Sequence, residues 1–284
     1  MWKKLKYLLI TKGAGFYINT LHLIHAKSAA NIAYNLFATP RKGKLKEIPT
    51  FLNSSVQKKL TYKDYTIQTY EWPNKGEKVL LIHGWESNTT RWKEIIKKLS
   101  KQNYHIIALD APAQGLNKGK ELNAVLYGEF INEVANYFKP SALIGHSLGG
   151  MTMLHYYDKF KPNFVTKIIS LGAPNRFLRI TDNYKNVLSL SKRSYSEFLK
   201  EFPRRFNVNP AEFNSEVFIK SIQIPLGIIH DKHDNIVPFS DAEEIINKHS
   251  KTELFVTENK GHSLYHKSIN EQIIYFLENN RFKS

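Results

Sequence analysis

Short apolar runs alternate with segments of helical periodicity along most of the chain. The apolar runs predict strands at about 56–62, 65–72, 78–83, 104–110, 141–146, 167–172, 225–230 and 252–257. The first two runs alternate in character, as in a solvent-edged hairpin, whereas the later runs are apolar almost throughout, as in strands buried on both faces. Apolar spacing predicts helices over 90–101, 121–138, 148–160, 239–249 and 266–280. This pattern predicts an α/β fold with an eight-stranded, mostly parallel sheet.

A glycine-rich turn joins the strand expected at 141–146 to the helix expected at 148–160. Its sequence, GHSLGG at residues 145–150, places a glycine two positions before and two positions after Ser147. Glycines at this spacing allow a sharp turn that lifts the serine hydroxyl above the sheet and starts a helix whose free N–H groups face the reacting centre. Such turns also occur in α/β proteins without catalysis. By itself, the motif therefore makes Ser147 only a candidate nucleophile.

Groups that could activate this serine follow in the chain order expected for such a turn. A serine hydroxyl needs a base, a group that orients the base, and donors for the developing oxyanion. Asp231 and Asp234 lie in a polar turn after the strand expected at 225–230, and either could be the acid. His262 follows Gly261 in a loop after the last predicted strand. The order serine, acid, histidine is therefore present.

The sequence HGW at residues 83–85 follows the strand expected at 78–83. Gly84 lets the chain turn close to the serine, so that a backbone N–H can point at the oxyanion. We expect the N–H groups of Trp85 and Leu148 to be the two donors. His83 is expected to be a buried hydrogen-bonding residue outside the catalytic triad.

Together these motifs resemble those of the α/β-hydrolase superfamily. The resemblance rests on HGW at 83–85, DAPAQG at 110–115, GHSLGG at 145–150, Asp234 with Val237-Pro238, and Gly261-His262, in the order of the superfamily over about two hundred residues. It implies Ser147 as nucleophile, His262 as general base and Asp234 as the orienting acid. The spacing to Val237-Pro238 favours Asp234 over the alternative, Asp231.

Two other positions bear on this resemblance. His266, four residues after His262, is expected in the final helix and outside the triad. Gln114 stands where many relatives carry histidine, and the difference is expected to affect lid contacts more than the chemistry.

The chain is expected to comprise a basic helical extension at 1–55 and a hydrolase domain at 56–284. A long insertion at about 173–223 is rich in aromatic and basic residues. A structureless loop of this length is uncommon in a compact domain. The resemblance implies that it forms a small helical cap over the site, and a solvated helical decoration is the alternative.

Residues 1–60 hold eleven lysines and arginines against one acid, Glu47, and so carry +10 of the net charge of +16. A membrane-surface segment with Trp2, Leu5, Leu8 and Leu9 as its inserting face is one interpretation. The other is an extension that packs on the hydrolase core. The small residues between positions 16 and 37 favour packing, and peripheral contact with the inner membrane face stays open.

The composition narrows the function further. Nucleic-acid binding is not expected despite a pI near 9.7, because no recognised motif is present and a lysine- and asparagine-rich composition can reflect an AT-rich genome. The absence of cysteine excludes disulfides and thiol catalysis, and the histidines lack metal-ligand spacing, so no cofactor or metal is expected. The apolar run at the amino terminus is interrupted before it could span a membrane, and a secretory signal is not expected. The expected location is cytoplasmic.

The expected activity is that of a carboxylesterase-like serine hydrolase, which cleaves a small-molecule carboxylic ester or thioester through an acyl-serine intermediate. The alternatives are an acyltransferase, a carbon–carbon bond hydrolase or a cofactor-free peroxidase with the same triad, and a non-catalytic ligand-binding protein on this fold. The sequence predicts neither the natural substrate nor the oligomeric state.

Overall fold

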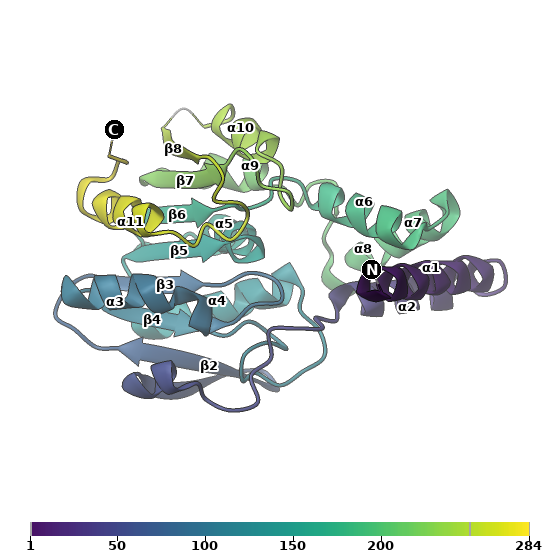
Figure 1. Cartoon of the computed structure of the whole chain (residues 1–284), viewed down its shortest axis with the longest axis horizontal. Helices are drawn as coiled ribbons and strands as arrows, with labels where there is room; N and C mark the ends of the chain where they lie inside the picture. Colours follow the sequence, from purple (N-terminus) through teal and green to yellow (C-terminus); the bar gives the residue numbers. More distant parts are fainter. Residues whose placement is uncertain (1, 250, 284) are drawn as a thin grey trace. The chain divides into compact units, whose positions relative to one another are not determined.

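The computed structural model describes residues 2–249 and 251–283, apart from the side chains of Lys3 and Lys4. It divides into two compact units (Figure 1). The sheet unit comprises residues 40–175 and 215–284, and the helical unit comprises residues 1–39 and 176–214. No helix among the described residues has both the length and the apolar character that crossing a bilayer requires.

The sheet unit is built on one eight-stranded sheet with the strand order β1-β2-β4-β3-β5-β6-β7-β8. The strands are β1 (Val56–Tyr62), β2 (Tyr65–Trp72), β3 (Lys78–Ile82), β4 (His105–Leu109), β5 (Ala142–His146), β6 (Lys167–Leu171), β7 (Leu226–Asp231) and β8 (Thr252–Thr257). β2 pairs antiparallel with both β1 and β4, and the other neighbours pair in parallel. The predicted strands agree with the observed ones to within one residue at each end, so the predicted fold class is confirmed.

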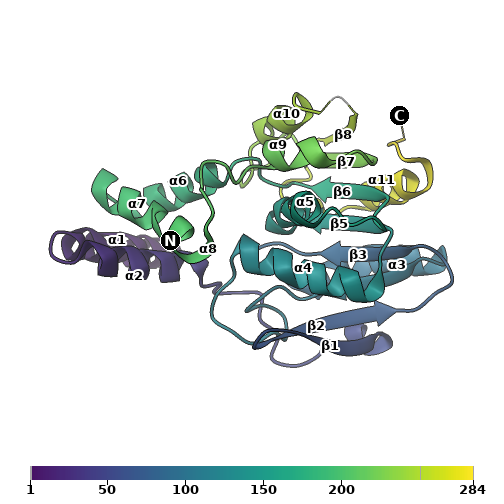
Figure 2. The ribbon, with the colours of Figure 1, turned by 180° about the vertical axis from the view of Figure 1, so that it is seen from behind.

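Helices cover both faces of this sheet. They are α3 (Lys93–Lys101), α4 (Ala124–Phe138), α5 (Leu148–Phe160), α9 (Ser215–Phe218), α10 (Ser240–Ile246) and α11 (Lys267–Asn279), with the short 3-10 helices η1 (Thr50–Ser54), η2 (Thr89–Trp92) and η3 (Ile219–Ser221). α3 and α11 lie on one face, and α4 and α5 lie on the other (Figures 1 and 2). Apolar side chains of β3 and β5 pack with α3 and α11 in a continuous core that includes Leu81, Ile144, Leu99 and Phe276. Because β3 and β5 to β8 run in parallel, the loops at their carboxyl ends meet at one edge of the sheet.

The helical unit contains α1 (Trp2–His22), α2 (Ala26–Ala38), α6 (Phe177–Leu188), α7 (Lys192–Leu199) and α8 (Glu201–Phe206). α1 packs against α2 and α6, and α2 packs against α7 and α8. Aromatic rings form the centre of this unit. Phe37 meets Phe177, Phe198 and Phe202 at centroid distances of 6.1, 5.5 and 6.0 Å, mostly edge to face, which is a preferred geometry for aromatic pairs.

The division into units differs from the predicted domains. Residues 1–39 form one unit with residues 176–214 of the insertion, and residues 40–55 belong to the sheet unit. Packing of the extension on the hydrolase core stays a prediction. The small residues of α2 are buried, as expected, and the hydroxyl of Tyr184 on α6 donates to the carbonyl oxygen of Ala33 at 2.8 Å. An apolar helix face shows that a helix packs, but it does not identify the segment that the helix packs against.

Candidate active site

The turn after β5 holds Ser147 in a conformation that is rare for a residue other than glycine. Its φ is 54° and its ψ is −128°, and α5 begins at the next residue. Neighbouring glycines make room for this turn. A Cβ atom on Gly149 would lie 2.3 Å from the carbonyl oxygen of His83, and one on Gly84 would lie 2.8 Å from Cβ of Ser147. The predicted sharp turn is therefore present, and the loop after β3 lies directly against it.

A continuous chain of hydrogen bonds links Ser147, His262 and Asp234. Nε2 of His262 lies 2.9 Å from Oγ of Ser147, and Nδ1 lies 2.7 Å from Oδ2 of Asp234. The other carboxylate oxygen of Asp234 accepts from the N–H groups of Ile236 and Val237 at 2.8 and 2.9 Å. Burial acts to raise the pKa of Asp234, but the hydrogen bonds from His262 and from these two N–H groups outweigh burial and lower it. Asp234 is therefore a carboxylate that accepts Nδ1–H, which leaves Nε2 free to accept the serine proton.

The alternative acid, Asp231, lies elsewhere in the hydrogen-bond network. Its carboxylate accepts from the hydroxyl of Thr257 and from the N–H groups of Lys260 and His233, at 2.8, 2.8 and 2.9 Å. It therefore ties the end of β7 to the loop that follows β8. The structure brings Asp234, and not Asp231, to His262.

His266 also lies away from the serine. It precedes α11 rather than lying within it, and its Nδ1 lies 2.8 Å from the hydroxyl of Ser268. Its side chain therefore caps the amino-terminal end of α11.

The two expected oxyanion donors lie on segments that meet at Ser147. Leu148 is the first residue of α5, so its N–H has no acceptor within the helix. Trp85 follows Gly84, whose close approach brings the loop after β3 beside Ser147. His83 is fully buried and shapes this loop, because its Nε2 accepts from the N–H of Ala111 and its Nδ1–H donates to the carbonyl oxygen of Gly84, both at 2.9 Å. Burial lowers the pKa of His83, consistent with a neutral ring.

Gln114 supports the same loop, and its expected effect on lid contacts stays a prediction. Its side chain is fully buried. The hydrogen-bond network orients its amide so that the nitrogen donates to the carbonyl oxygens of Gly84 and Ser87 at 3.1 Å each, while the oxygen accepts from the N–H of Glu86 at 2.6 Å. One side chain therefore holds the segment on both sides of Trp85.

Arg91 and His146, neither of which was predicted from the sequence, hold the backbone on the histidine side of the site. Arg91 donates to Nδ1 of His146 at 2.8 Å and to the carbonyl oxygen of Ser263 at 3.0 Å. Because a guanidinium only donates, Nδ1 of His146 is the acceptor, and Nε2–H donates to the carbonyl oxygen of His262 at 2.8 Å. Burial, followed by the charge of Arg91, holds the pKa of His146 well below its ordinary value, so this tautomer is neutral. The position of His146 inside the GHSLGG motif was the available signal.

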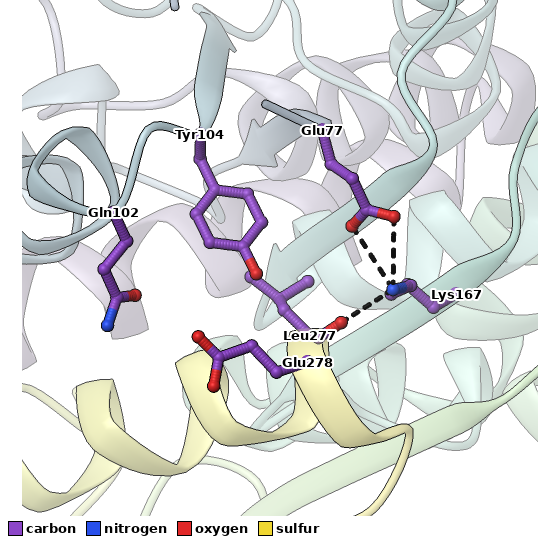
Figure 3. A pocket seen from close by; sticks show the side chains of 6 residues that line it. All are labelled: Glu77, Gln102, Tyr104, Lys167, Leu277 and Glu278. Atoms are coloured by element: carbon purple, nitrogen blue, oxygen red, sulfur yellow. Dashed lines mark hydrogen bonds and ion pairs between the residues drawn. The ribbon is translucent and has the colours of Figure 1, made fainter. Parts of the chain in front are cut away.

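A pocket of about 400 Å³ lies at the opposite edge of the sheet (Figure 3). Its lining includes Glu77, just before β3, and Lys167, the first residue of β6. The ammonium of Lys167 contacts the carboxylate of Glu77 at 3.2 Å and the carbonyl oxygen of Leu277 at 2.6 Å. This pocket faces the amino-terminal ends of the strands and is separate from the site at Ser147. Across residues 2–249 and 251–283, no group of three or more His, Cys, Asp or Glu side chains is arranged to hold a metal ion.

Comparison with known proteins shows sequence relatives that match part of the chain. A model of the alpha/beta hydrolase fold family matches residues 78–216. A pimeloyl-[acyl-carrier protein] methyl ester esterase of Aliivibrio salmonicida is 30% identical over 133 residues, which cover 46% of this chain and 49% of that protein. Phospholipase YtpA of Bacillus subtilis is 24% identical over 162 residues, which cover 51% of this chain and 62% of that protein. The chain thus spans about half to three fifths of the length of these relatives.

Solved structures with the same fold match more of the chain. The alpha/beta hydrolase domain-containing protein 10 from mouse has a TM-score of 0.62 at 16% identity, over 79% of this chain and 97% of its own. A membrane phospholipase A, described as a bacterial virulence factor, has a TM-score of 0.63 at 14% identity, over 99% of each chain. Since the strand order of the sheet, the family match across β3 to β6 and the solved structures agree, the chain has the α/β-hydrolase fold.

Proposed function

We propose that the protein is a serine hydrolase that cleaves a carboxylic ester or a thioester through an acyl-serine intermediate. The observation that supports this most strongly is the chain of hydrogen bonds from Ser147 through His262 to Asp234, at 2.9 and 2.7 Å. The sequence relatives include proteins named as esterases and as a phospholipase, which act on esters. The hydrogen-bond chain supports a nucleophilic serine, and the names of the relatives favour ester cleavage over the other reactions that the same triad supports.

In the proposed reaction, Nε2 of His262 removes the proton of Ser147 while Oγ attacks the carbonyl carbon of the ester. The tetrahedral oxyanion accepts hydrogen bonds from the N–H groups of Trp85 and Leu148. His262 then gives its proton to the departing alcohol or thiol, and the acyl group remains on Ser147. A water molecule gives a proton to His262 and attacks the acyl carbon. The bond from this carbon to Oγ then breaks and His262 returns the proton to Oγ, which releases the carboxylic acid and restores the serine hydroxyl. Asp234 orients the ring and stabilises its protonated form.

Arg91 and His146 position the base in this mechanism. Their hydrogen bonds end on the carbonyl oxygens of Ser263 and His262, so they fix the backbone that carries the imidazole. That the insertion caps the site remains a prediction from the resemblance.

The test is the initial rate on p-nitrophenyl esters from acetate to palmitate, for the wild type and for Ser147→Ala. We expect the variant to lose roughly 10⁴-fold or more in kcat, because removing the nucleophile disables the triad as a unit. The matched control is Ser54→Ala, at an exposed serine in η1, which should keep the wild-type rate. Labelling by a fluorophosphonate probe should disappear only in Ser147→Ala. A wild type that turns over no ester and takes no label would contradict the proposal and favour a ligand-binding role.

A further inference from the structure

One face of α1 is fixed to the carboxyl-terminal end of α6. Gly15 and Ile18 are buried there, and a Cβ atom on Gly15 would lie 1.7 Å from the carbonyl oxygen of Leu188, so the two backbones touch. The ammonium of Lys12 donates to the hydroxyl of Ser189 at 2.7 Å. The amide of Asn19 donates to the carbonyl oxygen of Ser189 at 3.0 Å. This face of α1 already has its packing partner within the helical unit.

A second line of apolar side chains runs along α1 about a quarter turn from the residues that pack on α6, and it is exposed. Trp2, Leu9, Phe16 and Leu23 recur every seven residues, which is close to two helical turns, so they follow one line along α1 and just past its end. Their exposed fractions are 83%, 65%, 75% and 75%, and Leu5 on the same side is half exposed. This set of five residues, the outer stripe, extends over about 30 Å. Apolar patches of this length on a protein surface mark sites of interaction, so the outer stripe requires an occupant.

The charge around the outer stripe indicates what that occupant is. No Asp or Glu precedes Glu47, whereas lysines stand at positions 3, 4, 6, 12 and 27. A second copy of the chain would bring two such basic segments together, and their repulsion would oppose the contact. An anionic phospholipid surface offers negative charge to the lysines and an apolar interior to the stripe. Trp2, at one end of the stripe, is of the aromatic type that is enriched at the membrane–water boundary.

We propose that α1 docks on the surface of an anionic phospholipid bilayer, with the outer stripe inserted at the level of the headgroups. The residues of α1 that pack on α6 stay there, so the helix lies along the surface with only the outer stripe in lipid. The proposal concerns a binding surface and does not depend on the proposed esterase activity.

The experiment is co-sedimentation of the full chain with vesicles of phosphatidylcholine alone and with vesicles of equal parts phosphatidylcholine and phosphatidylglycerol. We expect the protein to bind the anionic vesicles more tightly, and this preference should shrink as salt is added. The double variant Leu9→Gln/Phe16→Gln should bind at least about tenfold more weakly, because two apolar side chains no longer enter the bilayer. The matched control is Ile48→Gln/Val56→Gln, at two exposed apolar residues of the sheet unit, which should bind as the wild type does.

Lys6→Gln supplies an independent test because Lys6 is exposed and removing its charge leaves the stripe intact. It should weaken binding to the anionic vesicles about fivefold, the equivalent of one surface charge, and leave binding to phosphatidylcholine unchanged. Far-UV circular dichroism and the melting temperature of each variant should match those of the wild type.

Three results would overturn the proposal: no binding by the wild type, binding without preference for anionic lipid, or a double variant that binds like the wild type. A wild-type dimer that fails to bind vesicles and becomes monomeric in Leu9→Gln/Phe16→Gln would assign the outer stripe to a contact between copies of this chain. If the double variant does not fold, the salt dependence of the wild type and the Lys6→Gln result decide the question.

Discussion

The backbone at Ser147 combines local strain with precise placement of a hydroxyl group. A positive φ at a serine costs on the order of 1–3 kcal/mol and persists only where the surroundings impose it. Here the serine N–H donates to the carbonyl oxygen of Leu171 at 2.8 Å, and the serine carbonyl accepts from Gly150 at 2.9 Å. These hydrogen bonds hold the turn from both sides and so maintain its strained backbone. The strained turn in return places Oγ beside His262.

Changing Asp234 or Asp231 to asparagine should have different effects, on kcat in the first case and on stability in the second. Asp234→Asn removes the charge that stabilises the protonated ring of His262 and disturbs the tautomer, so we expect kcat to fall by roughly 10⁴. Asp231→Asn disturbs acceptors for Thr257 and Lys260, so we expect about 1–3 kcal/mol less stability. Its kcat should fall less than about tenfold, because Asp231 does not contact His262. The measurements are kcat on p-nitrophenyl acetate and the urea midpoint. The reverse pattern would assign the orienting role to Asp231.

At the scale of elements, what the sequence predicts depends on how local the signal is. The glycines that flank Ser147 and the glycine that precedes His262 are local motifs. They led to the prediction of Ser147 and His262, whose side chains are in contact in the structure. Apolar runs likewise predict the strands closely, because a strand that is buried on both faces is apolar at almost every position. The choice between Asp231 and Asp234 needed the resemblance, since both follow the same strand.

Contacts between distant elements could not be predicted in the same way. Arg91 reaches Ser263, and Gln114 reaches the loop after β3, across large separations along the chain. The sequence around a buried polar residue does not indicate which distant group will be its hydrogen-bond partner.

Gln114→Leu tests whether the loop after β3 donates a hydrogen bond to the oxyanion of the tetrahedral intermediate. The substitution keeps the volume but leaves the carbonyl oxygens of Gly84 and Ser87 without their donor, so the loop should shift. We expect kcat to fall by about 10- to 100-fold, which approaches the effect of losing one oxyanion donor. Affinity for a trifluoromethyl ketone, which mimics the tetrahedral intermediate, should weaken in parallel. Gln223→Leu, at an exposed glutamine, is the matched control. A fall in kcat with unchanged ketone affinity would remove Gln114 from this role.

At the scale of the whole molecule, the sheet unit encloses several histidines in their neutral form. His83, His146, His155 and His230 all belong to it, and burial lowers the pKa of each. For His155 the pKa falls to about 4. A histidine in an unfolded chain titrates near pH 6.5. Below that pH the unfolded state therefore binds protons that the folded state does not accept.

The stability of the protein should therefore decrease on acidification. Because each folded-state pKa lies below its unfolded value, the stabilisation is fully present above about pH 6.5 and is lost as the pH falls toward the folded pKa. His155→Phe should reduce the difference in the free energy of unfolding between about pH 7 and about pH 5 by roughly 2 kcal/mol, while the new ring can keep the contact with Phe218. Urea unfolding at both pH values measures the effect, with Met153→Leu on the same helix as the non-titrating control. If His155→Phe retained the full wild-type pH dependence, the buried neutral state of His155 would not contribute to the loss of stability in acid.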